Sequence, residues 1–273
     1  MTRGGVAFYF ISMRLKKRVS LVTQAVCFFI SILALQACST SGKKSLSQEE
    51  RVRLLVDMGN SSLIDGDPTG ALVSFLQAEN LDSSLPELNH SLAITYYLKN
   101  DLKMALKYAQ KAVSQKPSYS IAQNTLGKIH LELNQLDQAK EALTVAASDP
   151  VNREAYKAWT NLGVVEERRE NWSAAEKMYT EAIRSEPLNS CIAYFYRGNL
   201  KLKKNQYTEA IQDYTLASQK FCAKFGGAFL ALGQAYQQSK QYDLARKTYL
   251  EVVKRYPDTS MASQAMEQLR FMP

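Results

Sequence analysis

The sequence predicts an all-α fold, a right-handed superhelical solenoid of six helix pairs with a C-terminal capping helix. A small residue recurs with an alanine twelve positions later, and successive pairs of this kind lie 34 to 36 residues apart. That period is typical of stacked helical repeats, which usually bind other molecules and seldom catalyse. The six pairs are Gly59/Ala71, Ala93/Ala105, Gly127/Ala139, Gly163/Ala175, Gly198/Ala210 and Gly233/Ala245.

Each unit is expected to consist of two antiparallel helices that approach most closely at the small residues. Large apolar side chains at helical spacing would fill the space between units, because no unit can bury its apolar face alone. Four asparagine-containing pairs mark turns inside units: Asn100-Asp101, Asn134-Gln135, Asn171-Trp172 and Asn205-Gln206. After Pro257, apolar residues at helical spacing predict a short capping helix from Ser263 to Phe271.

The pattern inside the units resembles the tetratricopeptide repeat. The fourth unit matches best, with Trp159, Leu162-Gly163, Ala175, Tyr179, Ala182 and Pro187 in the characteristic positions. We therefore expect a six-unit array over residues 51–259, with the capping helix and tail over 260–273. The repeated aromatic residues are interpreted as packing groups of the core.

The N-terminus has the pattern of a bacterial lipoprotein signal peptide over residues 1–37. Arg14, Lys16, Lys17 and Arg18 precede an apolar run from Val19 to Ala34. Leu35-Gln36-Ala37-Cys38 then resembles the lipobox, in which the cysteine carries lipid such as palmitate. The alternative is a retained membrane anchor, but the run is shorter than the roughly 20 residues that a span needs. Met1 and Met13 are both candidate start residues.

Residues 38–50 are predicted to form a lipidated cysteine and a flexible polar tether. Five of the 34 basic residues lie in the signal segment, which leaves 29 basic against 26 acidic residues. The apparent formal charge of +8 therefore falls to +3, which argues against nucleic acid as a partner. The expected location is the periplasmic face of the bacterial outer membrane, by lipid anchor.

Two cysteines remain in the mature array. Cys191 opens the first helix of unit five and Cys222 follows its second helix, so antiparallel packing would bring them together. An oxidising periplasm favours a disulfide, and the alternative is two buried, unpaired thiols.

No enzyme, metal or cofactor site is predicted. Only His90 and His130 occur, on different units, and no phosphate loop, nucleophile elbow or metal-ligand spacing is present. Glu166, Glu167 and Glu170 lie among arginines and are expected on a solvated helical face. No small-molecule substrate is predicted either.

The family resemblance implies a concave groove, lined by the first helix of each unit, that binds a peptide segment of a protein partner. Carried over by position, the candidate groove residues are Arg53, Asn60, His90, Tyr97, Asn124, Lys128, Leu131, Lys157, Thr160, Val164, Phe195, Asn199 and Gln234.

The combination of lipobox, tether and six repeats resembles the type IV pilus biogenesis and stability lipoproteins, the PilW/PilF-type pilotins. That resemblance implies a tethered scaffold that assists assembly of a secretin. Two alternatives stay open. One is a general envelope scaffold for outer-membrane β-barrel assembly or cell-wall hydrolases, and the other is an accessory protein with a redox-active pair, Cys191 and Cys222.

Overall fold

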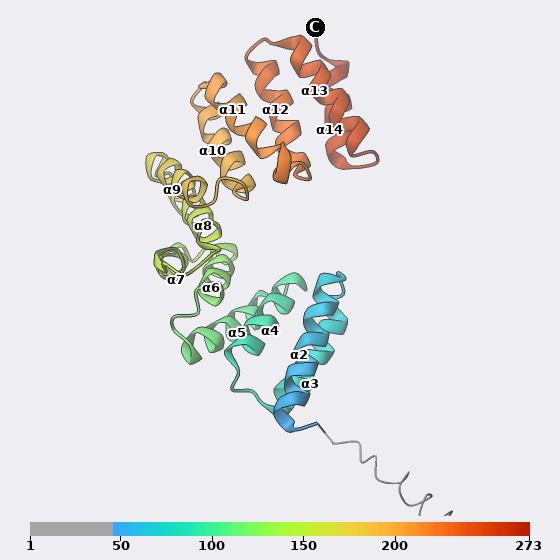
Figure 1. Cartoon of the computed structure of the whole chain (residues 1–273). Coiled ribbons are helices and arrows are strands. Elements are labelled where there is room, and N and C mark those ends of the chain that lie inside the picture. Colours follow the sequence, from blue (N-terminus) through green and yellow to red (C-terminus); the bar gives the residue numbers. More distant parts are fainter. Residues whose placement is uncertain (1–45) are drawn as a thin grey trace, which may run out of the picture. The chain divides into compact units, whose positions relative to one another are not determined.

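The computed structural model describes residues 46–273, in which all regular secondary structure is helical (Figure 1). Residues 50–273 form one compact unit. Within the described range thirteen α-helices make six pairs and a final single helix, which confirms the predicted solenoid. The pairs are α2 (Gln48–Ile64) and α3 (Pro68–Leu81), α4 (Pro86–Leu98) and α5 (Leu102–Gln115), α6 (Ser120–Glu132) and α7 (Leu136–Ser148), α8 (Ala155–Arg168) and α9 (Trp172–Ser185), α10 (Cys191–Lys203) and α11 (Tyr207–Ala217), and α12 (Gly226–Gln238) and α13 (Tyr242–Arg255).

A short 3-10 helix, η1 (Lys220–Cys222), lies between α11 and α12, and α14 (Ser260–Arg270) follows the last pair. From α3 onward each helix packs on the next, and the first helices of neighbouring units also touch, as α4 with α6 and α6 with α8. The predicted signal segment, the lipidated Cys38 and residues 39–45 of the predicted tether lie outside the described residues.

The two helices of a pair touch where a glycine of the first faces a large side chain of the second. In five units a Cβ atom on that glycine would lie within 2.8 Å of the facing side chain, which is closer than van der Waals contact. The facing side chain always lies sixteen residues later and is completely buried. These contacts are Gly59 with Phe75, Gly127 with Leu143, Gly163 with Tyr179, Gly198 with Tyr214 and Gly233 with Tyr249.

In unit two, alanine occupies both of these positions. Ala93 stands in the glycine position, and the residue sixteen positions later is Ala109; both are completely buried. The large side chain of this unit is supplied one residue earlier by Tyr108. Its ring stacks on that of Tyr96 at 5.4 Å between centroids, and its hydroxyl donates to Glu79 Oε2 at 2.9 Å. Where the first helix carries alanine in place of glycine, the facing residue of the second helix is therefore small as well.

The turns inside the pairs contain a residue with positive φ. Asn100, Asn134 and Asn205 have φ of 60°, 55° and 57°, a left-handed conformation that asparagine tolerates. In unit four this residue is Glu170, with φ of 62°, and not Asn171 as the turn pattern suggests. Asn171 instead precedes α9, and its side-chain amide donates to Glu166 Oε2 at 2.9 Å.

Two helix boundaries differ from those predicted. Helix α2 begins at Gln48, inside the segment predicted as tether, three residues before the predicted start of the array. Helix α14 begins at Ser260 and not at Ser263, because Thr259 caps it: the backbone N–H of Ala262 donates to Thr259 Oγ1 at 3.2 Å.

We predict that Gly163→Ala destabilises the protein by about 1–3 kcal/mol, because the added methyl group overlaps the buried ring of Tyr179. Urea unfolding followed by circular dichroism measures the change. Gly227→Ala is the matched control: its Cβ would lie 3.5 Å from Phe225, an ordinary contact, so it should be neutral or stabilising. The double variant Gly163→Ala/Tyr179→Ala has alanine at both positions, as unit two does. Its loss of unfolding free energy should be smaller than the sum of the losses in the two single variants. Strict additivity would contradict the account.

Candidate functional site

A pocket of about 540 Å³ lies between α8 and α10, with residues of α6 at its rim. Its walls come from three successive units and from the loop before α10. The polar lining comprises lysine, amide and hydroxyl groups, and no aspartate or glutamate lines it. The lining includes Asn124, Lys128, Lys157, Thr160, Asn161 and Tyr196.

The two lysines give this pocket a positive character. Lys128 Nζ lies 4.4 Å above the ring centroid of Tyr97, whose hydroxyl donates to Glu132 Oε1 at 3.3 Å. Lys157 pairs with Glu154 one turn before it on the chain. A ligand that brings a carboxylate or other acceptor groups would meet Lys128 directly and would compete with Glu154 for Lys157.

Amide groups form a second layer of the pocket. Asn161 Nδ2 donates to Asn124 Oδ1 at 3.0 Å, which links α8 to α6. Thr160 is nearly buried, and its hydroxyl donates to the carbonyl oxygen of Tyr156 at 2.7 Å. Asparagine side chains can both donate and accept, so they suit the backbone of an extended peptide.

Tyr196 lines both this pocket and an adjoining hollow of about 380 Å³, and helix α10 is held firmly around it. Its ring stacks on Tyr179 at 5.6 Å between centroids, and burial, reinforced by Glu167, raises the pKa of its hydroxyl. The next residue, Arg197, donates twice to Asp213 of α11, at 2.9 and 2.7 Å. Lys201 Nζ lies 2.9 Å from the same carboxylate, which is only 2% exposed. Removing one partner of such a buried group is costly, so α10 is fixed against α11.

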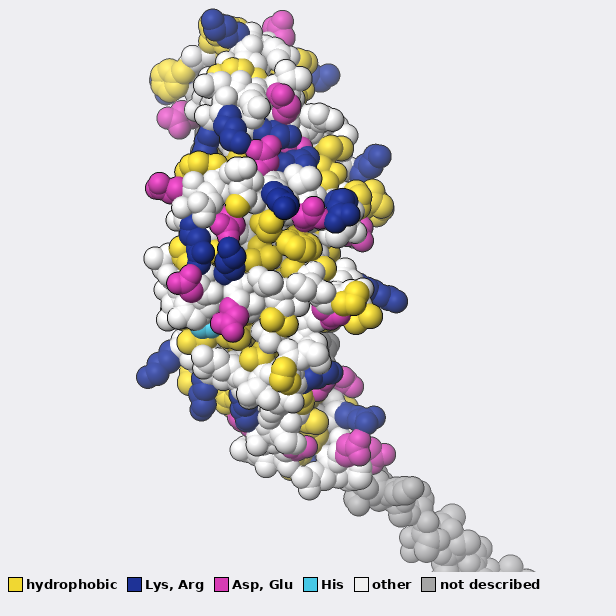
Figure 2. Space-filling model, turned by 90° about the vertical axis from the view of Figure 1, so that its left-hand side faces the viewer, with side chains coloured by type: hydrophobic (Ala, Val, Ile, Leu, Met, Phe, Trp, Pro, Cys, Tyr) yellow, Lys and Arg dark blue, Asp and Glu magenta, His cyan; other side chains and the backbone are white. Residues whose placement is uncertain are grey.

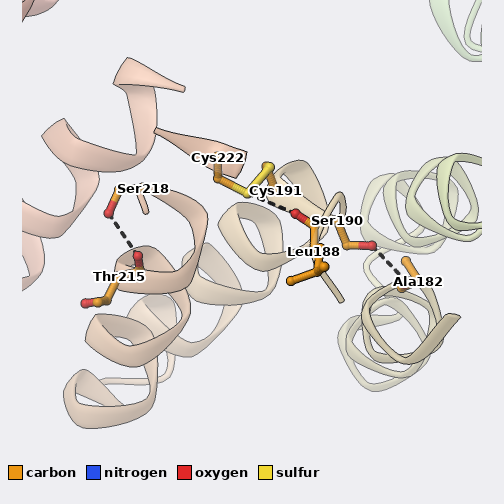
Figure 3. Close-up of a disulfide and its surroundings, with 7 residues drawn as sticks. All are labelled: Ala182, Leu188, Ser190, Cys191, Thr215, Ser218 and Cys222. Carbon is orange, nitrogen blue, oxygen red and sulfur yellow. Dashed lines mark hydrogen bonds between the residues drawn. A yellow bond between two sulfur atoms is a disulfide. The ribbon is translucent and has the colours of Figure 1, made fainter. Parts of the chain in front are cut away.

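The structure joins Cys191 and Cys222 in a disulfide at the edge of the pocket (Figure 3). The two Cα atoms lie 5.4 Å apart, and the bond closes a loop of 31 residues in sequence separation. Cys191 is the first residue of α10 and lines the pocket, while Cys222 ends η1. Beside it, Ser190 Oγ donates to the carbonyl oxygen of Ala182 at 2.8 Å. The disulfide therefore ties the start of α10 to the segment before α12.

The thirteen predicted groove residues do not all face one open surface. Four of them, Asn124, Lys128, Lys157 and Thr160, line the pocket, and Val164 lines the adjoining hollow. Leu131 and Phe195 instead pack in hydrophobic clusters of the core. Arg53 is exposed on α2, and Gln234 is partly exposed on α12.

Three further candidates form hydrogen bonds inside the array, two of them between neighbouring units. His90 is buried, and its Nε2 lies 2.9 Å from Thr125 Oγ1 of the next first helix. Asn60 Oδ1 accepts from Ser91 Oγ at 3.2 Å. Asn199 Oδ1 accepts from the hydroxyl of Tyr214 at 2.7 Å, within its own pair of helices. The polar atoms of these side chains are therefore engaged within the array and are less available to a ligand.

Glu166 is not on a solvated face, as the surrounding charges suggested. It is 6% exposed, and its carboxylate accepts from Lys140 Nζ at 2.7 Å and from Asn171. Burial by itself raises the pKa of Glu166, but the hydrogen bonds from Lys140 and Asn171 outweigh it and hold the pKa below its ordinary value.

Neither a metal site nor a membrane span is found in the described part of the chain. Within residues 46–273 no group of three or more His, Cys, Asp or Glu side chains is placed to hold a metal ion. In the same range no helix combines the length and the apolar character that crossing a bilayer requires.

Three family models, each described as a tetratricopeptide repeat, match residues 96–160, 166–223 and 228–259, which together make up more than half of the chain. The chain is a tetratricopeptide-repeat protein. Such repeats generally act as protein-interaction scaffolds. A search of curated proteins finds no match.

Solved structures of the same fold cover nearly the whole array. The chain is similar to PilF of Pseudomonas aeruginosa, with a TM-score of 0.67 and 19% identity over 81% of this chain and 99% of that one. PilW, described as a widely conserved type IV pilus biogenesis factor, gives a TM-score of 0.68 and 15% identity over 79% and 98%. The Cut9-Hcn1 hetero-tetramer of the APC/C gives a TM-score of 0.69 and 16% identity, over 88% of this chain and 46% of that one. At these identities the likeness concerns the fold alone.

We predict that acid destabilises the protein through His90. Burial lowers the pKa of His90 from 6.5 to about 4, against the opposing effect of Glu154 and Glu87. The unfolded chain therefore binds a proton below about pH 6.5 that the native protein excludes, and stability falls as the pH drops from there toward 4. Between pH 6.5 and 5 the free energy of unfolding should fall by about 1.5 kcal/mol. Urea unfolding at a series of pH values measures it; His90→Gln should remove this component and His130→Gln should keep it.

Removal of the disulfide should cost about 3 kcal/mol of unfolding free energy, because the unfolded chain regains the freedom of the closed loop. The measurement compares unfolding of the oxidised protein with that of Cys191→Ala/Cys222→Ala. A reducing agent should destabilise the parent protein and leave the variant unchanged. An equal effect of the reducing agent on both would contradict the assignment.

Proposed function

We propose that this chain is a non-catalytic scaffold, tethered to the outer membrane by lipid on Cys38, that binds a segment of a protein partner. The observation that carries the proposal is the pocket between α8 and α10, with its lysines and amides and without any lining carboxylate. Such a surface meets the acceptor-rich backbone and acidic side chains of a peptide. The repeat architecture supports the same conclusion, because stacked repeats expose long inner surfaces for binding.

Within that class, we propose a pilotin that assists assembly of a type IV pilus secretin. Support comes from the similarity of the array to PilF and PilW, the latter described as a type IV pilus biogenesis factor. The lipobox ending in Cys38 fits the same role, because a pilotin works beside the membrane. Confinement by the lipid would raise the effective concentration of the partner, and several acyl chains hold more firmly than one.

A general envelope scaffold is the second candidate, and it would use the same pocket with another partner. The redox alternative is the third candidate: Cys222 is only 4% exposed, but Cys191 is partly exposed and lines the pocket, so attack on the disulfide would come at Cys191. Titration of thiols in the native protein separates the cases: a structural disulfide leaves none to react, whereas a redox-active pair becomes reactive after mild reduction.

The test is in-cell crosslinking of the full-length protein, followed by affinity purification and mass spectrometry. A secretin should be among the strongest partners, and Lys128→Ala/Lys157→Ala should reduce its recovery several-fold, because the pocket loses its positive charge. Lys177→Ala, an exposed lysine on the second helix α9, is the matched control and should have no effect. Capture of barrel-assembly proteins or cell-wall hydrolases, without a secretin, would favour the general scaffold.

A further inference from the structure

Trp172 lies at a second pair of hollows, outside the predicted groove positions. It is the first residue of α9, and its side chain is 40% exposed. Lys203 Nζ lies 4.9 Å from the centre of the ring system and 3.1 Å from Glu167 Oε1. The lysine is thus held over one face of the indole. The tryptophan is placed by its surroundings and still open to solvent.

Two hollows of about 380 and 250 Å³ border Trp172. Val164 and Tyr196 line the first, and Leu200 and Lys204 line the second, while Lys203 borders both. On the face drawn in Figure 2, hydrophobic side chains are exposed among Lys and Arg side chains near the middle of the array. Apolar surface beside a rigid aromatic ring is well suited to take an apolar side chain of a partner.

The hollow of about 380 Å³ adjoins the pocket already described, and the hollow of about 250 Å³ adjoins it in turn at Trp172 and Lys203. Tyr196 lines both the larger pocket and the hollow next to Trp172, so the two share a wall. We call the pocket and the two hollows together the depression; their lining residues run along α8 and α10 from the N-terminal halves of these helices to their C-terminal ends. Basic side chains lie at both ends: Lys128 and Lys157 at the first, and Arg168, Lys203 and Lys204 at the second. The second end differs in the exposed indole of Trp172, and the first in its asparagine amides.

The length of this depression follows from helix geometry. Lys157 at the first end and Arg168 at the second are eleven residues apart on α8, and Ile192 and Lys203 are eleven apart on α10. At 1.5 Å per residue, either helix separates the ends by about 16 Å. An extended peptide covers that distance with about five residues at roughly 3.3 Å each.

We propose that Trp172 is the apolar anchor site for the partner segment, which lies extended along the depression between α8 and α10. The segment carries a carboxylate for Lys128 and Lys157 and, about five residues away, a large apolar side chain that packs beside Trp172. The inference rests on the proposed function, since it assumes that the pocket binds a peptide. It adds which surface the segment follows and what spacing it must have.

The experiment uses the full-length chain purified in detergent and dye-labelled synthetic peptides with acetylated N-termini and amidated C-termini. Each peptide contains one Asp and one Phe separated by two, four or eight Gly/Ser residues, and binding is followed by fluorescence anisotropy. The peptide with four intervening residues should bind most tightly. Trp172→Ala should weaken its binding about tenfold, and replacement of its Phe by Ala should weaken binding equally. Combining the two changes should cost little more than either alone.

Tyr242→Ala is the matched control, because Tyr242 occupies the same place in unit six as Trp172 does in unit four, as the first, partly exposed residue of its helix. It should leave peptide binding unchanged. Urea unfolding shows whether Trp172→Ala keeps the native stability. If that variant is destabilised, Trp172→Phe and the peptide lacking Phe carry the comparison.

Affinity that is independent of spacing and of Trp172 would overturn the inference, and so would the absence of binding by every peptide. Neither result bears on whether a secretin is captured in cells through Lys128 and Lys157. Conversely, spacing-dependent binding at Trp172 together with the absence of a secretin in cells would uphold the anchor site and overturn the pilotin proposal.

Discussion

The whole array depends on how closely the two helices of each pair approach. A glycine on the first helix leaves room for one large side chain of the second, and that side chain is then completely buried. Because the same contact recurs in five of the six units, each pair presents its remaining side chains at similar positions to the next pair. In the remaining unit, unit two, both positions are alanine, Ala93 and Ala109, and both are completely buried, so the small residue and its facing residue change together.

The candidate site draws its rigidity from interactions that lie outside it. Asp213 holds α10 through Arg197 and Lys201, and the disulfide holds its first turn. Because these partners fix α10 before any ligand arrives, binding need not order that helix, and less of the interaction free energy is lost to ordering. The lysines and amides of the pocket are thus presented on a framework that is already set.

The helix pairs, their period and the pairing of Cys191 with Cys222 follow from the sequence because each depends on spacing along one unit. The groove residues were harder to predict, since a first helix touches its own partner and the first helices on either side. His90 and Leu131 are buried by such neighbours, which one-unit spacing does not reveal. The surroundings of Trp172 were missed for the same reason: its walls come from α8, α9 and α10. The only available sign was a tryptophan where the other units carry proline, leucine or tyrosine.

The disulfide also sets how the chain responds to force. When the two ends of the array are pulled apart, tension runs along the backbone, and unlinked repeat units can unravel one after another. The segment from Cys191 to Cys222 cannot be drawn out, because the load passes through the sulfur bridge and bypasses the 31-residue loop. At up to about 3.6 Å per residue, this withholds roughly 100 Å of extension. Unit five, between the N-terminal four units and the last one, therefore lengthens much less under tension than a unit without a disulfide would.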